Sequence, residues 1–347
     1  MNYNKEKLID FLDESRINYS LNFDLIKNSW IKAGGKFEIY IQPDNFLKIS
    51  KLIDYFKKEE MDYYTVGNIS NILFRDGEIV TPIINLKKYS PIETLSNNEK
   101  SVLLKVGAGV NIFKFSNYIS NKLSCIGAEG LVGIPGSIGG GIYMNASSYD
   151  SCVSDFLKEV RFFDNNNILV VKSKKDLDFN WRKSLFHNYK RCLIVDGIFE
   201  IPHSNQRDKI VIENKIEFTK DHRKFFQEKE KPNLGSLFAT KDLYKDIKNV
   251  SLVFKSLYYF NIFFTKVINK IFKKNGVIFY RKIMVKIYSS FLGLNSVKLV
   301  KLSDRTINCV VNLNTKNSNI IINFIKMYEK KIKFSQKLEN IIKDKIS

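Results

Sequence analysis

The sequence predicts a mixed α+β protein. Segments with strand and helix character are short, and they alternate without the even rhythm of repeated βαβ units. At 347 residues the chain is long enough for about two or three domains. With 44% hydrophobic and 13% aromatic residues it can also bury a sizeable core. We therefore expect several folded α+β units and no extensive disorder.

The first half of the chain combines helical and strand patterns. Residues 1–20 read as a polar helix, and the alternation over 37–41 predicts a strand. Residues 45–59 have helical spacing, with five apolar side chains on one face: Phe46, Ile49, Leu52, Ile53 and Phe56. Further strands are expected at 101–106, 158–163, 167–172 and 192–200, with a helix at 111–123.

The second half is more basic. Residues 206–230 read as a mixture of a strand and a charged helix, and 240–292 form a basic block rich in aromatic residues. A strand at 307–313 and a long basic helix at 317–345 close the chain.

Cysteine and histidine usage argues against metal and disulfide sites. Only three histidines occur, and we expect no metal centre. The N-terminal sequence has no apolar core of signal-peptide type, so we expect a cytoplasmic protein. The four cysteines lie far apart, without the spacing of a disulfide scaffold: Cys125, Cys152, Cys192 and Cys309.

The net charge of +20, from 56 Lys and Arg against 36 Asp and Glu, raises nucleic acid or an anionic membrane as a partner. The compositional bias of an AT-rich genome and a role in solubility are simpler alternatives. Much of the excess lies in 251–300, which holds nine Lys or Arg, eleven Phe or Tyr and no acidic residue.

The longest uncharged run in this block, Ser256 to Thr265, has ten residues, whereas a membrane-spanning helix needs about 20. Three alternatives stay open: an interfacial helix, a nucleic-acid surface, or a helical insert packed on its own protein. No RNA- or DNA-binding motif accompanies the charge, so we expect no nucleic-acid partner.

A glycine-dense stretch carries the most information. Seven of the twenty residues in GAEGLVGIPGSIGGGIYMNA (127–146) are glycine. Glycine lets a backbone approach a ligand closely, and free N–H groups together with Ser137 would cradle a pyrophosphate. The alternative is a glycine-rich turn between tightly packed strands. The spacing matches neither a Walker A motif nor a Rossmann fingerprint.

The stretch GIPGSIGGGIYMNASSY closely resembles the flavin-binding segment of the UDP-N-acetylenolpyruvoylglucosamine reductase (UDP-N-acetylmuramate dehydrogenase, MurB) family. The resemblance covers about residues 25–240 and 293–345. Other segments agree in the same order: SWIKAGGKFEIYIQP, VGNISNILFRDGEI, FNWRKSLFH, RKFFQEKEKPNLGSLF and SDRTINCVVN.

The resemblance implies an FAD-binding region of two subdomains, of the MurB and vanillyl-alcohol-oxidase type, followed by an α+β substrate domain. The corresponding boundaries are 1–92, 93–205 and 206–347, with the basic aromatic insert at about 241–292.

The activity implied is the NADPH-dependent reduction of UDP-N-acetylglucosamine enolpyruvate to UDP-N-acetylmuramate, a peptidoglycan precursor. The cofactor would be FAD and the partner a UDP-sugar substrate. Two other functions stay open: a flavoprotein paralogue acting on another nucleotide sugar in surface polysaccharide synthesis, and a non-catalytic protein that docks on a membrane or a partner. Whichever function holds, 251–300 is a candidate for peripheral contact with the inner face of the membrane.

The resemblance also assigns site residues. Arg182 matches the cation that stabilises charge on the substrate carboxylate. Ser236 matches the proton donor. Glu339 stands near the position of a carboxylate that assists protonation. The residues matched to FAD contacts are Gly67, Ser70, Asn71, Gly133, Ile134, Pro135, Gly136, Ser137, Gly139, Gly140 and Asn145.

Several positions depart from the family pattern. Ile69 replaces a glycine of the first flavin loop, where a β-branched residue disfavours positive φ and close approach of a phosphate. Glu228 replaces a proline, Thr306 a histidine, and Ile341 stands at the expected glutamate. Because most departures fall in the substrate domain, the pattern fits either a paralogue that changed its substrate or a divergent active reductase.

Overall fold

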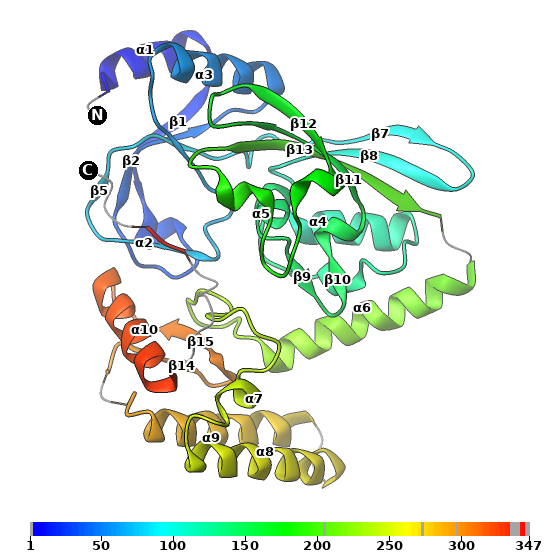
Figure 1. Cartoon of the computed structure of the whole chain (residues 1–347), viewed down its shortest axis with the longest axis vertical. Helices are drawn as coiled ribbons and strands as arrows, with labels where there is room; N and C mark the ends of the chain where they lie inside the picture. Colours follow the sequence, from blue (N-terminus) through cyan, green and yellow to red (C-terminus); the bar gives the residue numbers. More distant parts are fainter. Residues whose placement is uncertain (1–2, 204–205, 272–273, 296, 334–340, 344–347) are drawn as a thin grey trace.

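The computed structural model describes residues 3–203, 206–271, 274–295, 297–333 and 341–343. It confirms the α+β class: two five-stranded sheets form one end of an elongated molecule, and a helical hairpin forms the other (Figure 1). Within these ranges, no helix is both long and apolar enough to cross a membrane.

The first sheet is built from 18–84. Its strand order is β1-β2-β6-β3, with β5 also paired to β2. The β1–β2 pair is antiparallel, whereas β2, β6 and β3 run parallel. The bounds are α1 Lys5–Glu14, β1 Asn18–Asp24, α2 Leu25–Asn28, β2 Lys36–Gln42, α3 Phe46–Lys58, β3 Tyr64–Thr65, β4 Ile72–Phe74, β5 Glu78–Ile79 and β6 Ile83–Ile84.

The predicted strand at 37–41 and helix at 45–59 are therefore confirmed as β2 and α3. Four of the five apolar residues expected on one face of α3 are buried, Phe46 being half-buried. The helix expected at 1–20 is shorter, because β1 begins at Asn18.

The second sheet, within 92–202, is entirely antiparallel, in the order β12-β11-β13-β8-β7. It confirms the four strands expected there. The bounds are β7 Ile92–Asn97, β8 Ser101–Gly107, α4 Ile112–Asn117, α5 Ile138–Tyr143, β9 Ser147–Ser148, β10 Ser151–Cys152, β11 Leu157–Phe163, β12 Leu169–Ser173 and β13 Leu193–Pro202.

The two sheets share one hydrophobic cluster, which reaches from Leu8 on α1 to Ile201 on β13. Polar contacts also join them: the buried Tyr63 hydroxyl donates to Asn167 over 3.1 Å. The guanidinium of Arg161 on β11 lies 4.2 Å from the centre of the Phe46 ring. These contacts hold the loops between the sheets in fixed positions.

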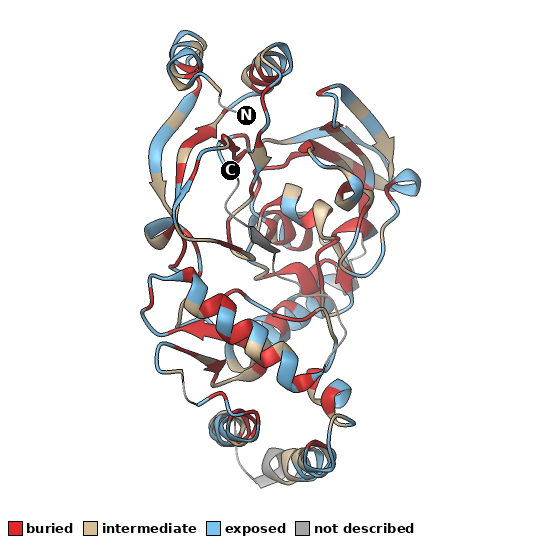
Figure 2. Ribbon diagram, turned by 60° about the vertical axis from the view of Figure 1, so that its left-hand side comes forward, coloured by how far each residue is buried: buried red, intermediate tan, exposed pale blue. Residues whose placement is uncertain are grey.

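The C-terminal part has its own hydrophobic cluster around Tyr288, Phe238 and Tyr328. Figure 2 shows buried residues on the inner faces of its helices and exposed residues on the outer faces. The bounds are α6 Gln206–Phe226, α7 Leu243–Ile247, α8 Leu252–Ile271, α9 Lys274–Phe291, β14 Val300–Ser303, β15 Thr306–Asn312, α10 Ser318–Ile332 and β16 Ile341–Lys343.

Two expectations are corrected. Residues 206–226 are one helix, so the strand expected in 206–230 is wrong. The helix expected at 317–345 ends at Ile332, and β16 pairs in parallel with β4 instead. The helix expected at 111–123 is confirmed as α4 and the wider helical turn Tyr118–Lys122 that continues it.

The basic aromatic block forms the hairpin α8–α9 together with α7. Its inner side chains Phe254, Tyr280 and Tyr288 are buried in the C-terminal cluster. The inner face of this block is therefore packed on its own protein, as one of the three alternatives expected, and its outer face is exposed.

Candidate active site

Two loops that resemble flavin loops meet between the sheets. The Ser70 hydroxyl donates to the Pro135 carbonyl over 3.2 Å. A Cβ added at Gly67 would lie 2.8 Å from Ser137 Oγ, closer than side-chain carbons normally approach. The Asn85 side chain donates to the carbonyls of Val66 and Gly67, both over 2.8 Å, and so fixes the first loop. Glycine at position 67 is thus required by the approach of the second loop.

Ile69 adopts a left-handed conformation with φ +49°. We expected this residue to disfavour positive φ; the loop keeps the glycine-like conformation instead. The Ile69 side chain is buried in a small cluster with Leu25, Phe37 and Ile79. Burial of an isoleucine side chain, worth about 1.5–3 kcal/mol, offsets a backbone cost of about 1–2 kcal/mol.

The second loop leads directly into α5. Ser137 caps this helix, with its Oγ accepting from the N–H of Gly140 over 3.3 Å. Gly139 packs on Ala108, where an added Cβ would lie 2.9 Å from the alanine Cβ. The glycines therefore allow close packing and would also let a ligand approach the backbone. The glycine-rich turn and the ligand-binding loop are thus compatible interpretations of 127–146.

One cavity of about 1280 Å³ opens beside both loops. This exceeds the roughly 300–1,000 Å³ of an ordinary small-molecule site, so there is room for a cofactor and a substrate. Arg182 and Ser236 line it. So do ten of the eleven residues matched to FAD contacts: Gly67, Ser70, Asn71, Gly133, Ile134, Pro135, Gly136, Ser137, Gly139 and Gly140.

Arg182 lies on a tight turn between Asn180 and Lys183, which pair through their backbones, and it has φ +52°. Its Nη2 donates to the Ser147 carbonyl over 3.1 Å. Its guanidinium lies 5.1 Å from the centre of the Trp181 ring. The turn and these contacts aim a fixed positive charge at the cavity.

Asn145 lies behind this turn, outside the cavity wall. It is buried, and its Nδ2 donates to the Asn180 carbonyl over 3.1 Å. Within the described ranges its Oδ1 has no hydrogen-bond partner. These contacts suit a residue that positions the Arg182 turn. Glu339 lies outside the described residues.

Arg223, near the end of α6, is a cavity residue that the sequence assignment missed. It is 3% exposed, and its partners are Gly130 O at 3.1 Å, Ser148 Oγ at 2.7 Å and Gln227 Oε1 at 2.9 Å. Its Nε is buried without a hydrogen-bond partner in the described part of the chain. The available signal was its place at the start of RKFFQ, one of the family-like segments.

Burial lowers the pKa of Arg223, and the nearby charge of Arg182 adds to this effect, against an opposing contribution from Tyr149. A buried cation whose hydrogen-bond partners are all neutral is costly. An anion in the cavity would offset that cost. Two guanidinium groups near each other therefore indicate an anionic ligand.

Tyr149 and His222 form a pair next to Arg223. The Tyr149 hydroxyl lies 2.6 Å from His222 Nδ1, and both residues line the cavity. Burial lowers the pKa of His222, and the positive charges of Arg281 and Arg223 lower it further. The imidazole is therefore neutral at pH 7.

Ser236 is exposed in the cavity, in a loop fixed on β15. Leu237 N donates to the Asn308 carbonyl over 3.0 Å, and Phe238 N donates to Asn308 Oδ1 over 2.8 Å. Asn308 Nδ2 donates back to the Phe238 carbonyl over 3.0 Å. Gly235, with φ +72°, makes the turn that presents Ser236.

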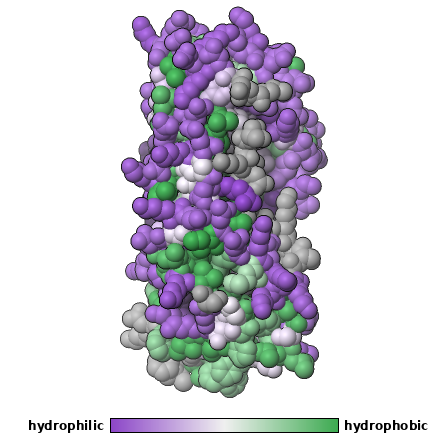
Figure 3. Space-filling model, turned by 90° about the vertical axis from the view of Figure 1, so that its left-hand side faces the viewer, coloured by the Kyte–Doolittle hydropathy of each residue, from purple (hydrophilic) through white to green (hydrophobic). Residues whose placement is uncertain are grey.

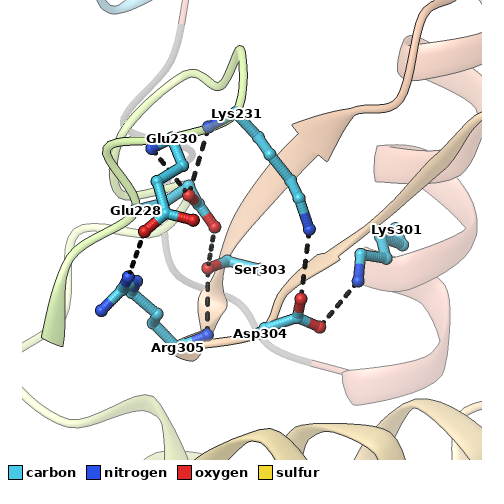
Figure 4. A network of polar contacts seen from close by, with 7 residues as sticks. All are labelled: Glu228, Glu230, Lys231, Lys301, Ser303, Asp304 and Arg305. Carbon is cyan, nitrogen blue, oxygen red and sulfur yellow. Dashed lines mark hydrogen bonds and ion pairs between the residues drawn. The ribbon is translucent and has the colours of Figure 1, made fainter. Parts of the chain in front are cut away.

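A polar network secures the same loop from the other side (Figure 4). Glu228, which replaces the family's proline, accepts from the N–H groups of Glu230 and Lys231 and from the Ser303 hydroxyl at 2.9 Å. Asp304 pairs with Lys231 at 3.1 Å. The replacement thus ties the loop to the β14–β15 turn.

The insert also reaches the cavity. Tyr258, Asn261 and Lys266 of α8 and Arg281 of α9 line the wall beside Thr306. Arg281 Nε donates to the Arg305 carbonyl over 2.9 Å, and its guanidinium lies 4.6 Å from the Phe226 ring centre. Sequence reasoning did not predict this, because nothing in a helical pattern shows which cavity a helix will border.

The residues present fit an FAD. Neither Gly67 nor Gly133 has ready room for a side chain. A Cβ at Gly67 would meet Ser137 Oγ, and a Cβ at Gly133 would lie 3.0 Å from Arg223 Cδ. The backbone around a left-handed residue such as Ile69 forms the concave anion sites seen in phosphate loops. The loops thus offer donors for a pyrophosphate, with the Arg223 Nε still unused among the described residues.

The cavity cysteines do not supply a nucleophile at neutral pH. Burial raises the pKa of Cys192 to about 12 and holds that of Cys309 well above its usual range. Both thiols therefore stay protonated at neutral pH.

Comparisons with known proteins agree with this geometry. The FAD-binding domain family matches residues 37–171. The chain is 28% identical to the UDP-N-acetylenolpyruvoylglucosamine reductase of Clostridium novyi, over 69% of the chain and 74% of that protein. It is 27% identical to that of Bacillus pumilus, over 67% of the chain and 75% of that protein.

Among solved structures, the UDP-N-acetylenolpyruvylglucosamine reductase of Thermus caldophilus superposes with a TM-score of 0.62. The superposition covers 94% of this chain and 98% of that one, at 18% sequence identity. This likeness supports the fold over nearly the whole chain.

Proposed function

We propose that this divergent member of the UDP-N-acetylenolpyruvoylglucosamine reductase family, an FAD-dependent oxidoreductase, uses NADPH to reduce UDP-N-acetylglucosamine enolpyruvate to UDP-N-acetylmuramate. The product would be a peptidoglycan precursor. The cytoplasmic location expected from the N-terminal sequence belongs to the same proposal.

One observation carries the proposal: both flavin-like loops, Arg182 and Ser236 line a single cavity, although they lie far apart in the sequence. The loops come from the two sheets, and Ser236 from the C-terminal part. A cation and a hydroxyl beside a dinucleotide-sized space are what the reduction of an enol ether requires.

In this reaction a hydride adds to one carbon of a double bond conjugated to a carboxylate, and a proton adds to its neighbour. Bound FAD, once reduced by NADPH, would supply the hydride. Charge then develops on the carboxylate, and Arg182, with Arg223 close by, would stabilise it. Because both guanidiniums are held by hydrogen bonds before substrate arrives, little reorganisation is needed.

Ser236 would deliver the proton. A serine is a weak acid in water, so the role needs a site from which water is excluded. The Ser236 side chain is exposed within the cavity, and the bound cofactor and substrate would themselves exclude that water. Hydrogen bonds to Asn308 and the Glu228 network fix the position of the loop that carries Ser236.

Lysine side chains that line the cavity suit the diphosphate of a UDP-sugar. Among them are Lys229, Lys241 and Lys266, together with Arg281. The ammonium of Lys241 lies 5.7 Å from the Trp181 ring centre, next to the Arg182 turn. Their charges would attract an anionic substrate.

A paralogue acting on another nucleotide sugar is the second candidate. The α8–α9 insert favours it, because side chains of both helices border the cavity at the substrate end. The redox chemistry at Arg182 and Ser236 would be unchanged, and only the sugar accepted would differ.

Replacement of Arg182 tests the proposal. Arg182→Lys keeps a positive charge but loses the guanidinium fork. We expect full flavin content and a loss of about 10²- to 10³-fold in substrate-dependent NADPH oxidation. Arg16→Lys is a matched control: Arg16 has the same φ of +52° and does not line the cavity. Equal activity of the two variants would refute the role of Arg182.

A further inference from the structure

The α8–α9 hairpin has a second apolar face whose large side chains are exposed in the described structure. On α8 this face carries Leu252, Tyr259, Phe260 and Phe263, which follow one another at helical spacing. Phe263 is 63% exposed and Leu252 83%. Figure 3 shows hydrophobic side chains gathered at this end of the molecule, whereas the opposite end is mainly hydrophilic.

Helix α9 adds to the exposed apolar surface. Phe279 is 67% exposed, and Ile283, one turn later, is also exposed. Ten of the 25 exposed large hydrophobic residues of the described chain lie within 251–299, about one seventh of its length. Scattered single residues need no explanation, but a contiguous concentration marks an interaction surface.

Positive charge surrounds this face. Lys255 on α8 and Lys282 and Lys286 on α9 are exposed, and 251–300 contains no acidic residue at all. An amphipathic helix with lysines beside aromatic and aliphatic side chains is typical of one that lies in the interface of a membrane. Each basic residue near an anionic surface contributes about 1 kcal/mol.

We propose that the outer face of the α8–α9 hairpin docks this enzyme on an anionic membrane surface. The helices would lie on the surface without crossing it, because no described helix is long and apolar enough to span a bilayer. The aromatic rings would enter the boundary between headgroups and acyl chains, and the lysines would contact the phosphates.

Charge complementarity selects this occupant over a second copy of the chain. A two-fold symmetric dimer would bring two identical faces together. Each belongs to a segment with nine basic residues and no acidic one, so like charges would oppose association. An anionic surface has no such penalty.

Docking would bring the cavity close to the membrane. Tyr258 and Asn261, on the inner side of α8, line the cavity, while Phe260 and Phe263 face away from it. Since a helix with its side chains is about 10–12 Å across, the substrate end would lie within about one helix diameter of the lipid. This inference is independent of which nucleotide sugar is reduced.

Co-sedimentation of the full-length, FAD-loaded protein with lipid vesicles tests the proposal. Vesicles of phosphatidylglycerol and phosphatidylcholine are compared with pure phosphatidylcholine, at low and high salt. We expect binding to the anionic vesicles only, weakened by salt because the charge interaction is screened. The double variant Phe260→Gln/Phe263→Gln should lose at least about tenfold in partitioning.

The matched control is Leu47→Gln/Phe113→Gln, which removes two exposed apolar side chains from α3 and α4, outside the hairpin. This control should bind vesicles like wild type, and both double variants should retain flavin and turnover. Absence of wild-type binding at low salt, or equal loss in both variants, would overturn the proposal. So would a dimer that the Phe260/Phe263 variant disperses, or displacement from vesicles by single-stranded oligonucleotide.

Discussion

At the scale of single residues, the conformation of Ile69 predicts an unusual order of stability for its variants. Its left-handed backbone costs about 1–2 kcal/mol for an L-residue but nothing for glycine. Ile69→Ala should cost about 2–5 kcal/mol through lost packing, and Ile69→Gly should cost less than alanine does. Ordinarily glycine is the worse of the two by roughly 0.5–1 kcal/mol.

Denaturant unfolding of both variants measures this order. Ile79 serves as the control, since it is buried in the same cluster but lies on β5 without positive φ. There the glycine variant should be less stable than the alanine variant. The same order at both positions would contradict the account of the first loop.

The environment of His222 predicts that the free energy of unfolding depends on pH. Its folded-state pKa is lowered below the ordinary 6.5 by burial and by Arg281 and Arg223, with Tyr149 facing it at 2.6 Å. The unfolded chain therefore binds more protons in this window. The stability contributed by neutral His222 is complete above about pH 6.5 and is lost as the pH falls through the folded-state pKa.

The free energy of unfolding at pH 7 and pH 5 measures this effect. Wild type should lose more stability over the interval than His222→Gln, which cannot titrate. Identical losses would show that the folded environment does not depress the histidine pKa.

At the scale of elements, the Ser236 loop depends on β15 through Asn308. Asn308→Ala removes two hydrogen bonds to Phe238 and leaves buried groups unpaired, at a cost of about 1–3 kcal/mol. We expect normal flavin content and normal reduction by NADPH, but slower reoxidation by the enolpyruvyl substrate. Asn308→Asp, which keeps the acceptor, should retain more activity than alanine; slowing of both half-reactions alike would contradict the positioning role.

The sequence predicted an element well when a pattern within a few neighbouring residues determines it. Four of the five strands of the second sheet were predicted, because alternation over a few residues determines them; β7, whose residues are mostly exposed, was not. The strand expected within 206–230 is not formed, and helix α6 stands there although it contains the β-branched run Ile210, Val211 and Ile212. Only Ile212 of these is buried, and it continues along the helix at Ile216, Thr219 and Arg223. Tertiary packing selected the helical spacing.

Site residues whose role depends on the local backbone conformation could be predicted from the sequence. Site residues that reach the cavity through tertiary packing could be predicted much less well. The glycine loops and the Arg182 turn carry their signals in the sequence. Arg223 lies in a family-like segment, but only the fold shows that its hydrogen bonds go to neutral groups and to no carboxylate. The side chains of α8 and α9 that border the cavity gave no sequence signal.

At the scale of the whole molecule, the net charge of +20 separates into parts with different roles. Arginines and lysines from distant segments converge on the cavity, where an anionic substrate would bind. The hairpin carries a further, outward-facing share at the end of the molecule away from the two sheets (Figure 1). Neither part requires a nucleic-acid partner.

The central claim is that one cavity joins flavin, substrate, Arg182 and Ser236 in a reductase. The most direct test follows the flavin absorbance of the purified protein without oxygen, first on addition of NADPH and then of UDP-N-acetylglucosamine enolpyruvate. We expect NADPH to bleach the flavin band and the enolpyruvyl sugar to restore it, with formation of UDP-N-acetylmuramate. A colourless protein that takes up no FAD, or a bleached flavin that the sugar does not reoxidise, would contradict the account.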